Sequence, residues 1–281
     1  MAEYPKRVAQ VPTYNTFREQ DVGKLPVLDV RNLGIDFGGL TAVDGFNITI
    51  GPTEISGLIG PNGAGKTTIF NLLTGVYQPT RGSVLVNGID IKSMPIHKVN
   101  KLGIARTFQN IRLFTDMTAL DNVKVGMHNN IKCSFFESLL HLPSYKRSEK
   151  KANARAMELL DFMGLAEFAD VKAGSLPYGV QRRLEIVRAL ATNPSIILLD
   201  EPAAGMNPSE TTELMHQIRR IRDTFQIAIL LIEHDMNLVM NVCEAIAVVN
   251  YGRIIAKGTP EEIRSNPAVI EAYLGKEESD A

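Results

Sequence analysis

The sequence predicts an α/β protein in which a sheet core is interrupted by a helical insert. Short apolar runs of strand length alternate with segments of helical spacing over most of the 281 residues, which is the pattern of α/β folds. One apolar run leads directly into a glycine-rich turn and a helix, an order suited to phosphate binding. From about residue 115 to residue 175 the pattern becomes largely helical.

Apolar periodicity places the individual elements. Helices are expected to begin near Lys66 and to cover residues 208–223 and 236–242. Within the insert, apolar residues from Ala152 to Met163 have helical spacing, and Gly164 is expected to end that helix. The expected strands cover residues 27–33, 45–50, 54–59, 83–86, 195–199, 227–232 and 245–249.

Composition limits the domain organisation and the partners. The formal net charge of −1 argues against a general nucleic-acid binder, which usually has a basic excess. The chain start lacks the apolar core of a signal peptide, and no run reaches the roughly 18 apolar residues of a membrane span. We therefore expect a soluble protein that meets a membrane only through a partner. A mobile extension is expected over residues 1–26, one folded domain over 27–275 and a short tail over 276–281.

The glycine-rich turn fits the P-loop pattern in full. It reads Gly60-Pro61-Asn62-Gly63-Ala64-Gly65-Lys66-Thr67, between an apolar strand and a helix. In such loops glycines allow backbone N–H groups to point at phosphate oxygens, the lysine reaches the β- and γ-phosphates, and the hydroxyl binds Mg²⁺. A purely structural glycine turn is the alternative. The residues expected to bind the nucleotide here are Asn62, Gly63, Ala64, Gly65, Lys66, Thr67 and Thr68.

Two carboxylates follow a later apolar strand. Asp200 and Glu201 come directly after the run Ile196-Ile197-Leu198-Leu199, and α/β sheets bind ligands at the carboxyl ends of their strands. Asp200 is expected to hold the metal through a water molecule, and Glu201 to polarise the attacking water. Without the P-loop, a solvated strand end would be the better explanation of these two residues.

Together with further motifs in order along the chain, these residues resemble an ABC ATPase. Gln109 lies where the family has its Q-loop glutamine, which the resemblance implies is an Mg²⁺ ligand coupled to the permease. His234 resembles the switch histidine that reaches the γ-phosphate. Phe37 is placed like the aromatic residue that stacks on adenine, and Val43 is expected as an apolar contact nearby. The alternatives are a solvated loop residue for Gln109, a loop histidine for His234 and a core aromatic for Phe37.

The resemblance covers about residues 27–275. It implies an α/β fold with a P-loop ABC ATPase core, an antiparallel β subdomain and a helical subdomain. It also implies ATP and Mg²⁺ as cofactors, with Lys66, Glu201 and His234 as catalytic residues and Thr67, Gln109 and Asp200 around the metal. The stretches at 106–114, 181–186, 233–236 and 258–263 resemble the ATPase subunit of bacterial high-affinity branched-chain amino-acid importers.

That family implies partners and a location. The chain would bind integral-membrane permease subunits at the cytoplasmic face of the inner membrane, and a periplasmic solute-binding protein would act through them. The importer would move a small solute, with branched-chain amino acids as the expected class. The family works as a dimer, in which each ATP lies between the P-loop of one subunit and the signature of the other.

The signature departs from the family pattern Leu-Ser-Gly-Gly-Gln. Here it reads Leu176-Pro177-Tyr178-Gly179-Val180. Pro177 removes a hydroxyl and an N–H donor, whereas Gly179 still offers an N–H group to the partner's nucleotide. We expect pairing with a different ATPase subunit, with a homodimer as the alternative. Harmless drift at a helix start would also explain Pro177.

A second feature of the insert has two interpretations. Residues 133–142 contain an apolar stripe near helical spacing, and four basic residues follow between Lys146 and Lys151. A packed helix with a solvated basic face is the simpler account. Contact with the permease or with lipid is the alternative.

Two other functions compete with transport. A soluble ABC ATPase acting on nucleic acid or the ribosome usually has two cassettes or a long coiled-coil insert, and this chain has neither. A regulatory ATP-binding module without turnover is disfavoured by the presence of Glu201 and His234. We expect no nucleic-acid partner.

Overall fold

The computed structural model describes residues 18–128 and 143–274. The chain divides into two compact units, Met1–Ile104 with Ser195–Ala281, and Ala105–Pro194. The helical insert expected at 115–175 lies within the second unit, which begins earlier and ends later than that pattern.

The first unit contains an antiparallel sheet with strand order β2-β1-β4-β5. β1 pairs with both β2 and β4, and Leu28 lies opposite Ile50 on one side and Val86 on the other. β2 begins five residues before the expected start, because its exposed first residues pair with the end of β1 without showing an apolar alternation. The strands are β1 (Leu28–Phe37), β2 (Leu40–Ile50), β4 (Arg81–Val86) and β5 (Ile89–Asp90).

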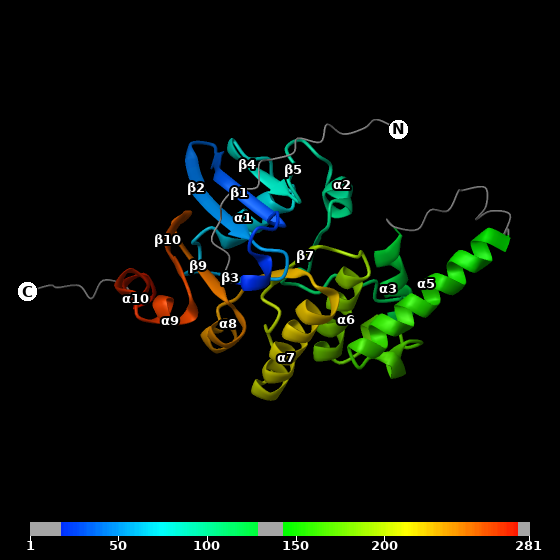
Figure 1. The fold of residues 1–281 in the computed structure, drawn as a ribbon. Helices are drawn as coiled ribbons and strands as arrows, with labels where there is room; N and C mark the ends of the chain where they lie inside the picture. The colour runs from blue at the N-terminus through cyan, green and yellow to red at the C-terminus, as the bar shows by residue number, and fades with distance from the viewer. Residues whose placement is uncertain (1–17, 129–142, 275–281) are drawn as a thin grey trace, which may run out of the picture. The chain divides into compact units, whose positions relative to one another are not determined.

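The larger sheet has the order β10-β9-β3-β8-β7-β6. Of these strands, Figure 1 labels β10, β9, β3 and β7. β3 pairs in parallel with β8 and β9, and β7 pairs in parallel with β8. Every residue of β3, β7 and β8 is buried, which explains their uninterrupted apolar runs. The strands are β3 (Ile55–Ile59), β6 (Ile104–Arg106), β7 (Ile196–Asp200), β8 (Ala228–Ile232), β9 (Ala245–Asn250) and β10 (Arg253–Gly258).

One hydrophobic core connects the two sheets of this unit. Helix α1 (Lys66–Leu73) buries Ile69, Phe70, Leu72 and Leu73, which belong to one cluster with side chains from both sheets. The helix that follows the glycine-rich turn is thereby fixed between the sheets. The other helices of this unit are α2 (Ile96–Lys101), α7 (Pro208–Phe225), α8 (Met236–Val242), α9 (Pro260–Arg264) and α10 (Pro267–Leu274).

The second unit is helical. Its elements are α3 (Ala119–Met127), α5 (Pro143–Phe162), α6 (Tyr178–Leu190) and the short 3-10 helices Ala166–Phe168 and Ala173–Ser175. The apolar stripe predicted from Ala152 to Met163 is buried. Gly164, with φ of 66°, takes the left-handed conformation expected just after a helix. The stripe at 133–142 lies outside the described residues. In the described ranges, no helix is both long enough and apolar enough to cross a bilayer.

Part of the segment expected to be mobile contacts the core. Residues 1–17 lie outside the description, but Glu19–Asp21 form a short 3-10 helix. Asp21 has no exposed surface, and its carboxylate accepts hydrogen bonds from the Thr53 N–H at 2.9 Å and from the Thr53 hydroxyl at 3.1 Å. Residues 18–21 are therefore attached to the loop before β3.

Replacing Asp21 by alanine should lower the free energy of unfolding by about 1–3 kcal/mol, because the Thr53 donors would lose their buried acceptor. Urea unfolding measures this change. Lys92→Ala is the control, because its side chain is exposed and lies outside the Asp21 contacts. Equal stability of the two variants would contradict the anchoring role of Asp21.

Candidate nucleotide-binding site

Three parallel strands end together at one edge of the larger sheet. β3 leads into the glycine-rich loop, β7 ends at Asp200 just before Glu201, and β8 ends just before Glu233 and His234. Ile232 of β8 is paired with Leu58 of β3 on one side and with Asp200 of β7 on the other. The strand register thus brings three predicted motifs to the same edge.

The conformation of the glycine-rich loop requires glycine at two close approaches. Gly60 has φ of 156°, and a Cβ there would lie 2.1 Å from the carbonyl oxygen of Val249. Gly65 precedes α1 with φ of 99°, and its Cβ would lie 3.1 Å from the Ala42 oxygen. No side chain caps α1. Its first N–H groups are therefore suited to an anion.

Lys66 lies against this loop. Its Nζ donates hydrogen bonds to the carbonyl oxygens of Gly60 at 2.6 Å and Pro61 at 2.9 Å. Burial lowers the pKa of Lys66, while the charges of Glu201 and Asp200 oppose that shift. The ammonium group is therefore close to both the loop and the carboxylates that follow β7.

The two carboxylates differ in exposure. Asp200 is 4% exposed, whereas the Glu201 side chain is 21% exposed. Glu201 has φ of 47°, a left-handed conformation that costs a non-glycine residue about 1–3 kcal/mol. Its Oε2 lies 3.8 Å from Nδ1 of His234, which is 65% exposed. Glu201 and His234 thus lie side by side where water has access.

Glu233 is a buried residue of this sheet edge to which the sequence analysis assigned no role. It is 1% exposed, and its Oε1 accepts the Ala203 N–H at 2.8 Å. Its Oε2 accepts the backbone N–H groups of His234 at 3.1 Å and Asp235 at 3.4 Å. One carboxylate therefore fixes both the segment after Glu201 and the backbone of His234. The only signal in the sequence was its position directly after a buried strand.

We expect Glu233→Gln to lower ATP turnover about ten- to a hundredfold. The amide NH₂ would face one of the N–H donors, and a small misplacement of Glu201 or His234 has effects of this size. Steady-state hydrolysis measures the change. Asp235→Asn is the control, because asparagine caps α8 as well as aspartate does. Equal turnover in the two variants would contradict this role.

The Glu233 substitution should also alter the pH dependence of stability. Burial raises the pKa of Glu233 above its ordinary value of 4.5. The stabilising contribution of this group to the free energy of unfolding is therefore fully present below pH 4.5. It is lost as the pH rises through the pKa of Glu233 in the folded protein. The free energy of unfolding of Glu233→Gln should not decline in this pH range, and urea unfolding at a series of pH values measures it. The same pH dependence in the variant and the wild type would contradict the prediction.

Comparison with known proteins agrees with these motifs. The sequence matches the ABC transporter family over residues 43–204. It is 49% identical over 251 residues to the high-affinity branched-chain amino acid transport ATP-binding protein BraF of Pseudomonas aeruginosa, covering 89% of this chain and 98% of BraF. The chain belongs to the ABC transporter family. The identity to LivG of Escherichia coli K12 is also 49%, with the same coverage.

Further matches agree with this assignment. Residues 253–279 of this ABC ATPase match the family described as branched-chain amino acid ATP-binding cassette transporter. An ATP-binding cassette of an ABC transporter in its ADP conformation superposes with a TM-score of 0.77 at 32% identity, covering 89% of this chain and 99% of that cassette. The expected fold, with its P-loop core, antiparallel β subdomain and helical subdomain, is confirmed.

The two residues expected to contact adenine differ in their exposure. Phe37 is 44% exposed, which excludes the alternative of a core aromatic, and its ring packs edge-on against Tyr77 with centroids 5.4 Å apart. Val43 has no exposed surface and belongs to the core cluster. Its side chain cannot contact a base in this conformation, because β2 packs it inward.

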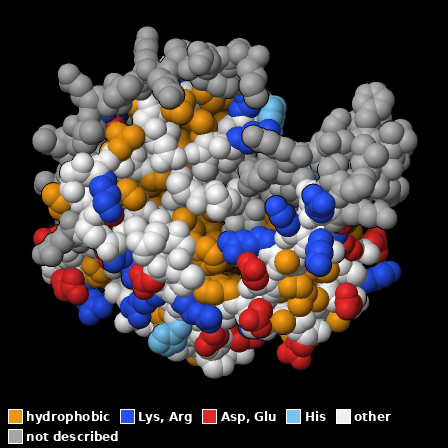
Figure 2. All heavy atoms as spheres, turned by 45° about the vertical axis from the view of Figure 1, so that its right-hand side comes forward, with side chains coloured by type: hydrophobic (Ala, Val, Ile, Leu, Met, Phe, Trp, Pro, Cys, Tyr) orange, Lys and Arg blue, Asp and Glu red, His pale blue; other side chains and the backbone are white. Residues whose placement is uncertain are grey.

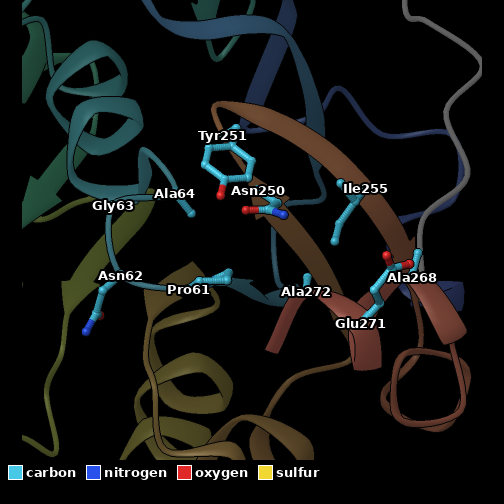
Figure 3. Close-up of a pocket in the computed structure, with 10 residues that line it drawn as sticks. All are labelled: Pro61, Asn62, Gly63, Ala64, Asn250, Tyr251, Ile255, Ala268, Glu271 and Ala272. Atoms are coloured by element: carbon cyan, nitrogen blue, oxygen red, sulfur yellow. The ribbon is translucent and has the colours of Figure 1, made fainter. Parts of the chain in front are cut away.

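A cavity of about 510 Å³ is lined in part by residues 61–64 of the P-loop. Figure 3 shows its lining from Pro61 to Ala64, from the β9–β10 hairpin and from α10. Burial raises the pKa of the Tyr273 phenol, and a hydrogen bond with the Gly60 backbone opposes that shift. The helix within the segment matched to branched-chain amino acid cassettes thus contacts the P-loop.

Gln109 and Gly179 belong to the helical unit. Gln109 is exposed, and its backbone carbonyl accepts a hydrogen bond from Arg182. Gly179 is half-buried in the first turn of α6. Pro177 is the N-cap of α6, with φ of −55° and no side-chain capping bond. The helix forms despite the proline, whose fixed φ is compatible with this position.

Proposed function

We propose that this chain is the ATP-hydrolysing subunit of an importer for branched-chain amino acids. The observation that carries the proposal is the convergence of the P-loop, Asp200–Glu201 and His234 at one sheet edge, in a chain that is 49% identical to BraF and LivG. The match spans 98% of each relative's length. A separate match to the branched-chain amino acid cassette family covers residues 253–279. This combination supports both ATP hydrolysis and the solute class.

In this proposal each residue has one role. Phe37 stacks on adenine, and the N–H groups of residues 62–68 bind the phosphates. Lys66 neutralises the β- and γ-phosphates. Glu201 polarises the attacking water, and His234 contacts the γ-phosphate. The exposure of Phe37, Glu201 and His234 supports these roles, because a ligand and water can reach all three.

The donor set fits Mg²⁺ carried by ATP. In the described part of the chain, no cluster of three or more His, Cys, Asp or Glu could hold a metal by itself. Thr67 and Asp200 supply hard oxygen donors beside the P-loop, and Mg²⁺ commonly combines one or two protein oxygens with nucleotide phosphates and water. The family resemblance adds Gln109 as a further Mg²⁺ ligand. The bound ion would neutralise phosphate charge.

We further propose that the chain pairs with a different ATPase subunit. Its own P-loop, Glu201 and His234 would meet the partner's signature in a competent site. Its signature offers the Gly179 N–H to the partner's nucleotide, but Pro177 provides neither hydroxyl nor N–H. A homodimer would place this weakened signature in both sites, which is why the heterodimer is favoured.

The chain would act at the cytoplasmic face of the inner membrane, bound to permease subunits. A periplasmic solute-binding protein would deliver the amino acid on the other side. Acidic and basic side chains are interspersed over the lower part of the face in Figure 2, which supports a protein partner over nucleic acid.

Purification of the tagged chain from its native cell in mild detergent tests this proposal. Recovery of two very hydrophobic proteins and a second ATPase is expected. Recovery only from the soluble fraction, alone or with nucleic-acid-associated proteins, would contradict the importer role and leave the ATPase assignment intact.

A further inference from the structure

Helix α6 contains a buried ion pair that the roles above do not use. The side chains of Arg182 and Glu185 are each 2% exposed, and Nη1 of Arg182 lies 3.2 Å from Oε2 of Glu185. Both residues belong to the helix whose first turn carries Gly179. Charged residues are almost never buried without such a pairing.

The pair also binds the backbone around Gln109. Arg182 donates to the carbonyl of Phe108 at 2.6 Å and to the carbonyl of Gln109. Oε1 of Glu185 accepts the N–H groups of Phe108 and Arg112, each at 3.4 Å. Four polar backbone groups between residues 108 and 112 are therefore hydrogen-bonded to this one buried ion pair. All of these contacts lie within the helical unit.

Aromatic contacts restrict the same segment further. The guanidinium of Arg112 lies 4.3 Å from the centre of the Phe108 ring, and that of Arg106 lies 5.1 Å from it. The Phe108 backbone is therefore fixed by the ion pair, and its ring by two cations. The neighbouring Gln109 is exposed. A rigid support beneath an exposed residue is the arrangement expected where that residue must meet a ligand.

Stability alone does not explain the pair. Apolar residues of similar volume are often as stabilising as a buried ion pair, or more so. Those residues could not bind the backbone of residues 108–112. We propose that Arg182 and Glu185 are positioning residues that join the signature helix to the loop of Gln109, so that the two move as one body during the ATPase cycle. This inference rests on the proposed function, in which Gln109 couples the nucleotide to the permease.

The test uses the double variant R182M/E185L in the purified complex. Removing both charges leaves the four backbone groups and the nearby Arg188 without these partners, so the melting temperature should fall while the fold is retained. Amide hydrogen exchange at Phe108 and Arg112 should accelerate. The ratio of solute-stimulated to unstimulated hydrolysis should fall from several-fold in the wild type toward one, because the support behind Gln109 is lost.

The pair Arg155 and Glu158 on α5 provides a matched control. It has the same spacing in the same unit and an N···O distance of 3.0 Å, but its side chains are 50% and 64% exposed. R155M/E158L should leave both readouts unchanged. A double variant R182M/E185L with wild-type exchange and a wild-type stimulation ratio would overturn the proposal, and so would faster exchange with an unchanged ratio.

Two further measurements apply if the double variant unfolds or if the wild-type complex shows no solute stimulation. If the double variant unfolds, Arg182→Lys replaces it, because lysine keeps the charge but cannot reach two carbonyls with a planar fork; normal exchange and stimulation in that variant would overturn the proposal. If the wild-type complex shows no solute stimulation, the importer proposal fails. The ion pair is then tested by amide hydrogen exchange and by the Mg²⁺ concentration that half-saturates hydrolysis. That concentration should rise about tenfold in the double variant. An unchanged half-saturating concentration would overturn the proposal.

Discussion

Replacing Lys66 by alanine is expected to abolish ATP hydrolysis and to weaken ATP binding on the order of 10²- to 10³-fold. Lys66 supplies a positive charge at the P-loop, where the nucleotide would place its β- and γ-phosphates. The loss of one hydrogen-bonded charge from a desolvated pair has an effect of this size. Fluorescent ATP-analogue titration and steady-state hydrolysis measure the two losses.

The fold should tolerate the Lys66 substitution. Nζ donates only to the carbonyl oxygens of Gly60 and Pro61 in the hydrogen bonds observed, and water can replace the donor at a partly buried site. Lys101→Ala, an exposed lysine at the end of α2, is the control for loss of charge. ATP binding in Lys66→Ala as tight as in the control would contradict the role of Lys66.

Glu201→Gln should reduce turnover in the assembled complex by about 10²- to 10⁴-fold while ATP binding is retained. Glutamine has the same shape but cannot accept the proton of the attacking water, and a general base contributes a factor of this size. The expected signature is loss of hydrolysis with an undiminished rise in melting temperature when ATP is added, because a bound ligand stabilises the folded state.

A surface glutamate provides the control for Glu201. Glu213→Gln on α7 changes the same functional group, whose carboxylate accepts a hydrogen bond from Gln217 at 3.0 Å. It should leave turnover unchanged. Near-full turnover in Glu201→Gln would contradict both the catalytic assignment and the proposed asymmetry, because it would mean that the other site of the dimer hydrolyses ATP.

The fold and the convergence of the motifs could be predicted because they depend on local signals. The strand before the P-loop and the strand before Asp200 are buried on both faces, so their apolar runs are continuous. Parallel strands end at the same edge of a sheet, so the order of the motifs indicated a common site. The residue roles at that edge remain proposals that the two substitutions above address.

Other features could not be predicted because they depend on contacts between distant residues. Glu233 binds the N–H of Ala203, 30 residues earlier in the chain. Asp21 binds Thr53, 32 residues later. Val43 was expected near the base, but its burial depends on how β2 packs in the core. Arg182 and Glu185 have the spacing of an ordinary surface pair on a helix, and their burial depends on tertiary packing that this spacing does not reveal.

The central claim is that ATP hydrolysis by this chain drives the import of branched-chain amino acids. The most direct measurement is ATP hydrolysis by the purified complex in lipid vesicles, with the solute-binding protein added empty or loaded with leucine, isoleucine or valine. The account predicts a several-fold stimulation by the loaded protein that Glu201→Gln abolishes. Hydrolysis that does not respond to any of the three amino acids would contradict it.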